Sequence, residues 1–219
     1  MKFIELSPPT AFQDAIESLK GTKRIVVCGS EEDKQYIEDG MKDSTQSVDE
    51  IITVSKQIDI HAWFAERKDK LDQDAEKDLT ELLGEWPAEP EPQQGFSLTF
   101  DMLSGKPHED LVGAEIETDA SWEIPAHFKF GGWNECAEPE LHCAIWKYWH
   151  QKYGAQIVGV SNDVIEAYIT NPPKTKEEAV QLAWEQYLYC YDIVDHGVET
   201  ISNLGVSIIS HSSWYFWWD

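Results

Sequence analysis

Three closely spaced prolines, Pro87, Pro90 and Pro92, constrain the fold of this chain more than any other feature. Proline lacks a backbone donor and fixes φ, so no helix continues through this stretch and an extended connector is favoured. At 219 residues and 42% hydrophobic content, the chain suits one large domain or two small ones. We therefore predict an N-terminal region over residues 1–84, a connector over 85–95 and a C-terminal domain over 96–219.

Apolar spacing in the N-terminal region predicts alternating helices and strands. The expected elements are a helix over Ala11–Leu19, a strand over Ile25–Cys28, a helix from Ser30 to about Met41, a strand over Ile51–Val54, and a long helix or broken helix pair over Ile58–Leu83. A strand, a glycine and a helix in this order also occur in dinucleotide-binding folds. Gly29 stands alone, without the further glycines that let a backbone approach a pyrophosphate, so no such site is predicted.

The C-terminal domain carries strand and helix signals in an order that predicts an α+β fold. We expect strands over Phe96–Phe100, Leu111–Ile116, Gln156–Val160, Asp163–Thr170 and Trp214–Trp218, an extended segment over Trp122–Phe130, and helices over Glu138–Tyr153, Thr175–Tyr189 and Val198–Ile209. Thr175 and Glu178 form a capping box, and Ser161-Asn162 predicts a hairpin turn. The expected class is α+β, with a largely antiparallel sheet flanked by helices and a smaller α/β N-terminal region.

The charge of the chain restricts its partners. Its 41 acidic residues against 17 lysines and arginines leave a formal net charge of −24. Nucleic acids and anionic membrane surfaces are bound by neutralising their charge with Lys and Arg, so neither is an expected partner. A basic protein fits this charge better, and the alternative is that the acidity reflects only a solvated surface.

The N-terminal residues and the cysteines indicate an intracellular protein. No apolar run after Met1 is long enough for a signal peptide, and no stretch approaches the ~20 apolar residues of a membrane span. Four cysteines occur in unlike contexts without a Cys-x-x-Cys pair, which argues against a zinc knuckle and a disulfide framework. We expect a cytoplasmic protein with reduced, mostly buried thiols.

A series of motifs in the second half carries a family resemblance. The series comprises Gly131-Gly132-Trp133-Asn134-Glu135-Cys136, Trp149-His150, Tyr153-Gly154-Ala155, Asp163-Val164-Ile165-Glu166, Pro172-Pro173, Glu178-Ala179, Leu182-Ala183, Glu185-Gln186-Tyr187, Tyr189-Cys190, Asp192-Ile193-Val194, Gly197, Thr200, Leu204 and Trp214-Tyr215-Phe216-Trp217-Trp218-Asp219. In this order and spacing the chain, from about residue 111 to 219, resembles the bacterial domain-of-unknown-function family 4253. It departs from the family at Ala137 and Tyr191, where the resemblance implies proline. The resemblance implies no activity and no cofactor.

The segment Gly131–Cys136 is the first candidate for chemistry. Its candidate residues are Trp133, Asn134, Glu135 and Cys136. Paired glycines permit unusual backbone angles beside a thiol at the start of a helix, where the helix dipole stabilises a thiolate. This pattern is typical of a cysteine nucleophile, with His142 or His150 as its partner and Glu135 as a base. The alternative is structural, because cysteine is often buried and the glycines then serve only to turn the chain.

The same segment and the following helix also suggest a metal site. Cys136, His142, Cys143 and His150 are the metal-binding residue types here. On a helix, neighbouring residues point about 100° apart and positions eight apart lie about 12 Å from each other along the axis. A structural zinc ion needs four ligands at close spacing, so we predict no metal site.

Two further features lie near the end of the chain. Asp192, Asp195 and His196 form a polar cluster, which suits an acid–base pair or a ligand contact, or else a cap on a turn or on the last helix. Trp214–Trp218 places aromatic residues on both faces of one strand. Either both faces are covered or one of them lines a groove for a partner or ligand.

Two classes of function are consistent with these patterns. The first is an acidic protein-binding module, such as an immunity-like protein that neutralises a basic bacterial toxin. The second is a small hydrolase or ligand-binding enzyme that uses Cys136 or the Asp192, Asp195 and His196 cluster. The first is our leading hypothesis, because the chain has strong acidity and no complete catalytic motif.

Overall fold

The structure is a computed structural model of residues 1–219 that describes residues 1–75, 77–88, 95–101 and 103–219. Its strands are β1 (Lys2–Glu5), β2 (Lys23–Gly29), β3 (Val112–Glu117), β4 (Ala155–Val160), β5 (Val164–Ile169) and β6 (Ser213–Trp217). Its α-helices are α1 (Ala11–Ser18), α2 (Glu31–Asp43), α3 (Val48–Ser55), α4 (Ile60–Gln73), α5 (Leu79–Leu83), α6 (Ile124–Phe128), α7 (Pro139–Tyr153), α8 (Lys176–Tyr189) and α9 (Ile201–Ile208). Ser121–Glu123 forms a 3₁₀ helix and Ile193–Val198 a π-helix.

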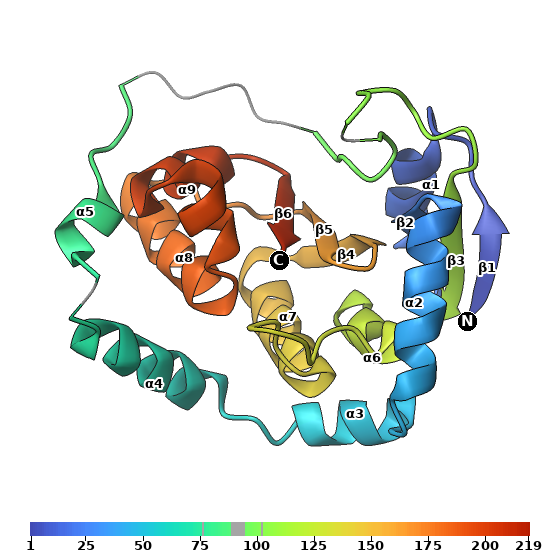
Figure 1. Ribbon diagram of the computed structural model, residues 1–219, viewed down its shortest axis with the longest axis horizontal. Helices are drawn as coiled ribbons and strands as arrows, with labels where there is room; N and C mark the ends of the chain where they lie inside the picture. The colour runs from blue at the N-terminus through green and yellow to red at the C-terminus, as the bar shows by residue number, and fades with distance from the viewer. Residues whose placement is uncertain (76, 89–94, 102) are drawn as a thin grey trace.

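The six strands form one mixed sheet in the order β1-β3-β2-β4-β5-β6 (Figure 1). Neighbouring strands are antiparallel except β2 and β4, which run parallel with Val27 opposite Gly159. The predicted hairpin is present as β4 and β5. The predicted α+β class with a largely antiparallel sheet is therefore confirmed.

The sheet joins the two parts of the chain that the prolines separate. Strands β1 and β2 precede the predicted connector over residues 85–95, and β3 to β6 follow it. Residues 89–94 of that connector lie outside the described residues. Because β3 pairs with both β1 and β2, the two sides share backbone hydrogen bonds. The division into residues 1–84, 85–95 and 96–219 stays a prediction.

Both faces of the sheet are covered. Side chains alternate along a strand, so Val26 and Cys28 enter the larger core while Val27 between them enters a smaller one. Helix α1 packs on the smaller core, and α7, α8 and α9 supply the larger. In Figure 1, helices α2, α3, α4 and α5 lie around the outside of α7, α8 and α9. No helix among the described residues has the length and apolar content that crossing a bilayer requires.

The predicted strand over Ile51–Val54 is wrong, because this segment belongs to helix α3. Ser47 and Glu50 form a capping box that begins the helix. Ile51 and Ser55, one turn apart, are buried on the side that packs against α7. Local capping and long-range packing therefore outweigh the strand preference of the β-branched residues.

Two segments predicted as extended are also different in the structure. The expected strand over Phe96–Phe100 is a turn in which only Phe100 forms an isolated bridge, to Pro107. The expected extended segment over Trp122–Phe130 instead contains most of the 3₁₀ helix and the whole of α6. Pro125 lies in the first turn of α6, where its missing N–H has no helical acceptor to lose. The proline is thus a start signal here.

The last predicted helix, over Val198–Ile209, is shorter than expected. The π-helix ends at Val198, and Glu199 at φ 71° separates it from α9. Thr200 caps α9 by accepting a hydrogen bond from the Asn203 N–H. The predicted broken pair over Ile58–Leu83 is present as α4 and α5, and strand β1 was not predicted.

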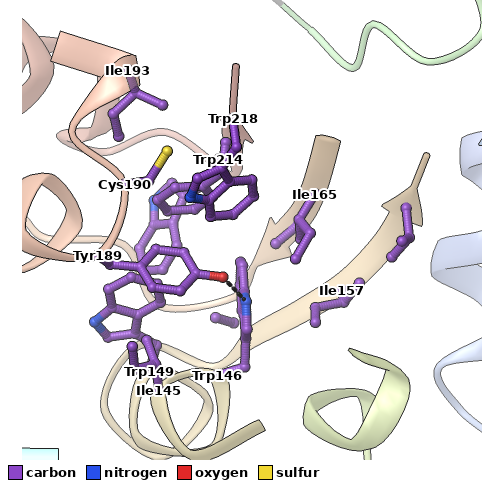
Figure 2. Packing of buried hydrophobic residues seen from close by; sticks show 14 of the residues in the cluster. Ile145, Trp146, Trp149, Ile157, Ile165, Tyr189, Cys190, Ile193, Trp214 and Trp218 are labelled. Carbon is purple, nitrogen blue, oxygen red and sulfur yellow. Dashed lines mark hydrogen bonds between the residues drawn. The ribbon is translucent and has the colours of Figure 1, made fainter. Parts of the chain in front are cut away.

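Aromatic side chains fill the larger core between α7, α8 and β6 (Figure 2). Trp146 and Trp149 meet edge to face with centroids 5.4 Å apart, and Trp149 stacks on Phe216 at 5.6 Å. Strand β6 lies at the sheet edge with Trp214 and Phe216 buried, while Tyr215 on its other face is 38% exposed. One face of the aromatic strand is therefore core.

A buried glutamate attaches the segment before β3 to the sheet. Glu166 in β5 is 1% exposed and accepts hydrogen bonds from the Ser97 hydroxyl at 2.8 Å and from the Ser97 and Leu98 N–H groups. Burial raises the pKa of Glu166 to about 7, although these donors act to lower it. The carboxyl therefore titrates near neutrality in the folded chain.

This pKa predicts a pH-dependent stability. The pKa of Glu166 is higher in the folded chain than the ordinary value of 4.5, so the folded state binds more protons between about pH 4.5 and 7. The contribution of Glu166 to the free energy of unfolding is complete below pH 4.5 and falls by about 3 kcal/mol as the pH rises through 7. Chemical denaturation at pH 5 and 8 measures it.

The matched variants are Glu166→Gln and, as a control on an exposed strand residue, Glu117→Gln. The stability difference between the wild type and Glu166→Gln should shrink from pH 5 to pH 8, and by more than the difference between the wild type and Glu117→Gln changes. A wild-type advantage over Glu166→Gln that is equal at both pH values would contradict the prediction.

Candidate functional site

The Gly131–Cys136 loop connects α6 to α7 through a tight backbone turn. Gly131, Gly132 and Asn134 have φ values of 107°, 85° and 45°, in the region that favours glycine. The Gly132 N–H donates to the Ala137 carbonyl at 2.9 Å, and the Cys136 N–H donates to the Trp133 carbonyl at 2.8 Å. A Cβ on Gly131 would clash with the Ala137 carbonyl oxygen. The paired glycines therefore have a steric purpose.

The predicted partners Cys136 and His142 do meet, in the protein core. Cys136 Sγ lies 3.4 Å from His142 Nε2, and His142 Nδ1 contacts the Tyr189 hydroxyl. The same hydroxyl accepts a hydrogen bond from Trp146 Nε1 at 2.9 Å (Figure 2). All four side chains are buried. The contacts connect the loop, α7 and the end of α8.

The hydrogen bonds of the Tyr189 hydroxyl match one tautomer of His142. The Tyr189 oxygen accepts from Trp146, and its own hydrogen can donate to His142 Nδ1. The proton of the neutral imidazole then sits on Nε2, the nitrogen that faces Cys136. The lone pair of His142 is occupied by Tyr189, so it is not directed at the Cys136 thiol.

Burial reinforces the neutral state of this pair. It raises the pKa of the Cys136 thiol far above its ordinary value, and it lowers the pKa of His142 to about 3. At neutral pH the two groups are a thiol and an uncharged imidazole. A cysteine nucleophile needs a thiolate, so these contacts fit the structural interpretation better.

The other residues of the metal hypothesis point elsewhere. Cys143 packs with Ile51 and Ala126 in a separate cluster, and His150 Nδ1 lies 3.0 Å from the Ala155 carbonyl oxygen. Residues 1–75, 77–88, 95–101 and 103–219 contain no group of three or more His, Cys, Asp or Glu placed to hold a metal ion. All four cysteines are free and buried, as predicted.

The second predicted cluster divides into two pairs. The 4% exposed Asp192 lies 3.1 Å from His196 Nδ1 through Oδ1 and accepts from the Asp219 N–H through Oδ2. Asp195 forms an ion pair with Lys77 at 2.6 Å and accepts from the Tyr187 hydroxyl at 3.3 Å. Since Thr200 caps α9, the alternative that one of these aspartates caps that helix is wrong.

The loop and the second cluster are neighbours in space. Asn134 Nδ2 donates to the Asp219 carbonyl at 2.7 Å, and the Asp219 N–H donates to the Asp192 carboxylate. The structure therefore brings the candidate residues from two distant sequence segments into one region. Two surface pockets are lined in part by residues of this loop, the first by Glu135 and the second by Trp133.

The first, which we call the α4 pocket, has a volume of about 350 Å³. Its lining includes Arg67, Lys70, Lys77, Glu135, Tyr187 and Asp195. Arg67 lies 3.7 Å from Glu135 and donates to the Leu188 carbonyl, so α4 is fastened to the loop and to α8. Arg67 and Lys77 were missed because no local pattern reveals that α4 packs there.

The second, which we call the Trp133 pocket, has a volume of about 400 Å³. Its aromatic lining residues are Tyr36, Phe128, Phe130, Trp133 and Trp218. Its polar lining residues include Lys129, Asn162, Asp163 and Asp219. Asp163 and Tyr36 were not among the predicted site residues, since the approach of α2 to the β4–β5 turn has no signal in the sequence.

Comparison with known proteins agrees with the sequence motifs. A family model described as a domain of unknown function (DUF4253) matches residues 113–219, which confirms the predicted resemblance. Searches of curated proteins and of solved structures found no match. The description of the family names no reaction, ligand or partner.

The buried network predicts slow thiol chemistry. At pH 7.5 an aromatic disulfide reagent should modify Cys136 at least roughly 100-fold more slowly than free cysteine, because the thiol is enclosed and protonated. Peptide mapping by mass spectrometry assigns the modified residue, and the chain in guanidinium serves as the fully reactive control. Labelling of Cys136 faster than free cysteine would contradict the neutral-pair assignment.

The loop geometry predicts contrasting effects of two glycine substitutions. Gly131→Ala should destabilise the chain by about 2–4 kcal/mol, because the new Cβ meets the Ala137 carbonyl in a left-handed backbone conformation. Gly40→Ala, in open space within α2, should stabilise it by about 0.5–1 kcal/mol. Denaturant unfolding measures both, and a neutral Gly131→Ala would show that the turn is not fixed as described.

Proposed function

We propose, from the premise that residues 113–219 belong to the DUF4253 family, that the protein is an acidic module that binds a basic protein. In its sharpest form the proposal is an immunity-like protein that neutralises a basic bacterial toxin. The family description assigns no activity. The support for the proposal comes from the charge and the geometry of the chain.

The few positive charges of the C-terminal half are mostly engaged within the molecule. Five lysines and no arginine follow Gly113. Lys129 donates to the Ser44 carbonyl, and Lys152 pairs with Glu185. Lys147 and Lys176 lie over the rings of Trp122 and Trp86. Sixteen Asp and Glu residues follow Gly113, so the five lysines leave this half with a large excess of negative charge.

Helices α2, α3 and α4 add exposed carboxylates. Exposed acidic residues on α2, α3 and α4 include Glu32, Asp39, Asp43, Asp49, Asp69 and Asp72. A net charge of −24 on a chain of this length attracts a basic protein over many ångströms and accelerates its encounter. The large excess of acidic over basic residues, many of them exposed, beside a buried and neutral Cys136–His142 pair, is the observation on which the proposal depends.

A second candidate function has one observation in its favour. Buried Asp192 contacts Nδ1 of His196, whose side chain is 58% exposed, so a carboxylate orients an imidazole that faces solvent. This arrangement occurs in general bases. His196→Gln should then abolish hydrolysis of a small ester such as p-nitrophenyl acetate, whereas a binding module would retain its partner affinity in this variant.

The test of the leading proposal is salt-dependent capture. The immobilised 219-residue chain should retain a basic protein at 50 mM salt, with the product of an adjacent gene as the first candidate to purify. The affinity of the purified pair should fall steeply by 500 mM salt, because screening removes the long-range attraction. Retention that does not depend on salt, or no basic protein retained, would contradict the proposal.

Charge variants on one helix sharpen this test. Asp69→Asn with Asp72→Asn should slow association of the purified pair by roughly twofold per charge at low salt, and Lys68→Gln beside them should accelerate it. Stopped-flow or surface-plasmon measurements give the rates. Equal rates for the acidic and the basic variants would show that charge does not steer the encounter.

A further inference from the structure

The Trp133 pocket lies where a sheet of this topology offers a binding crevice. Strands β2 and β4 are adjacent and parallel, and their carboxyl ends lead into Ser30 and Ser161. In sheets with parallel strands, ligands bind outside the carboxyl ends where neighbouring connections diverge. From β2 the chain passes into α2, and from β4 it turns directly into β5. The pocket of about 400 Å³ is lined by residues of α2 and of the β4–β5 turn.

Aromatic rings form much of the pocket lining. Phe130 meets Trp133 edge to face at 5.0 Å and Trp218 at 5.5 Å. Phe130 and Trp218 are buried, Trp133 is half-buried and Tyr36 is 57% exposed. Ring faces attract organic cations, most strongly where the cation leaves water. The lining therefore suits a positively charged group attached to an apolar stem.

Asp163 lies in the pocket lining, and Asp33, which accepts hydrogen bonds from Ser30 in the capping box of α2, is linked to it through Asn162. Asn162, with its amide NH2 facing acceptors, donates to Asp163 at 3.2 Å and to Asp33 at 2.8 Å. Neither aspartate has a Lys, Arg or His within ion-pair distance in the part of the chain that the structure describes. Burial raises the pKa of Asp163 and the charge of Asp33 adds to the effect, while a hydrogen bond from Ser161 opposes it.

Lys129, which lies in the pocket lining, does not neutralise Asp33 or Asp163. Lys129 Nζ donates to the Ser44 carbonyl at 2.7 Å and forms no ion pair with Asp33 or Asp163. Asp219 contributes a further carboxylate to the lining. An anionic ligand would meet repulsion from these groups, whereas a cation would reduce the repulsion between Asp33 and Asp163.

We propose that the Trp133 pocket binds an alkylammonium or guanidinium group, with its apolar stem against the rings and its charge beside Asp163. Where the cation is a lysine or arginine side chain of a partner protein, this inference rests on the proposed function. The Trp133 pocket is then the place where that side chain binds. Where the cation is a free amine, the pocket binds it independently of any protein partner.

Calorimetric titration of the 219-residue chain tests the proposal. The probes are Nα-acetyl-arginine methylamide and Nα-acetyl-lysine methylamide, with the uncharged Nα-acetyl-norleucine methylamide as the matched control. Both cations should bind at least tenfold more tightly than the norleucine amide. Equal binding of the three amides, or no binding of the cations, overturns the proposal.

Substitutions locate the bound cation. Asp163→Asn and Tyr36→Leu should each weaken cation binding at least fivefold, and Tyr36 is exposed enough for that variant to fold normally. Asp72→Asn makes the same charge change outside the pocket and should have little effect. Weakening by Asp72→Asn as large as that by Asp163→Asn would show non-specific attraction and overturn the site.

The outcomes separate this inference from the proposed function. Cation binding that depends on Asp163, in a chain that retains no basic protein, would support the pocket with a free amine as its ligand and refute the protein partner. Salt-dependent capture of a basic protein that Asp163→Asn and Tyr36→Leu leave unchanged, with no binding of the cationic amides, would refute the pocket and leave the partner intact.

Discussion

The parallel pairing of β2 with β4 is the contact on which the rest of the structure depends. It inserts an N-terminal strand into the sheet of the DUF4253 region, while β3 pairs on the other side of β2. Because β2 leads into α2, the same pairing brings that helix to the β4–β5 turn and forms one side of the Trp133 pocket. The N-terminal region thus contributes to both the sheet and the candidate site.

The chemistry of the candidate site follows from where its polar groups lie relative to water. Cys136 and His142 form the arrangement expected of a nucleophile and its base, yet burial and Tyr189 hold both groups neutral. Asp163, in the lining of the Trp133 pocket, is only partly buried and forms no ion pair with a Lys, Arg or His among the described residues. The proposed recognition of a positive group rests on this contrast between the two sites.

Local signals predicted the elements that have complete boundaries in the sequence. Helix α8 has the capping box of Thr175, and α7 has Pro139 at its start and Gly154 at its end. The signals failed where tertiary packing decides the outcome, as for Ile51 in α3, whose β-branched neighbours suggested a strand. Likewise Cys136 and His142 were predicted, but Tyr189 forty-seven residues further along was not, because its hydroxyl reaches them only through the fold.

The most direct test of a cation-binding function uses the tryptophans as reporters at known depths. In a chain with ¹⁵N-labelled indoles, titration with Nα-acetyl-arginine methylamide should shift the NMR signal of Trp133, which lines the pocket. Trp146 and Trp149, enclosed in the core, should keep their positions. A Trp133 signal that does not move, in a sample where the amide is shown by calorimetry to bind, would contradict the account.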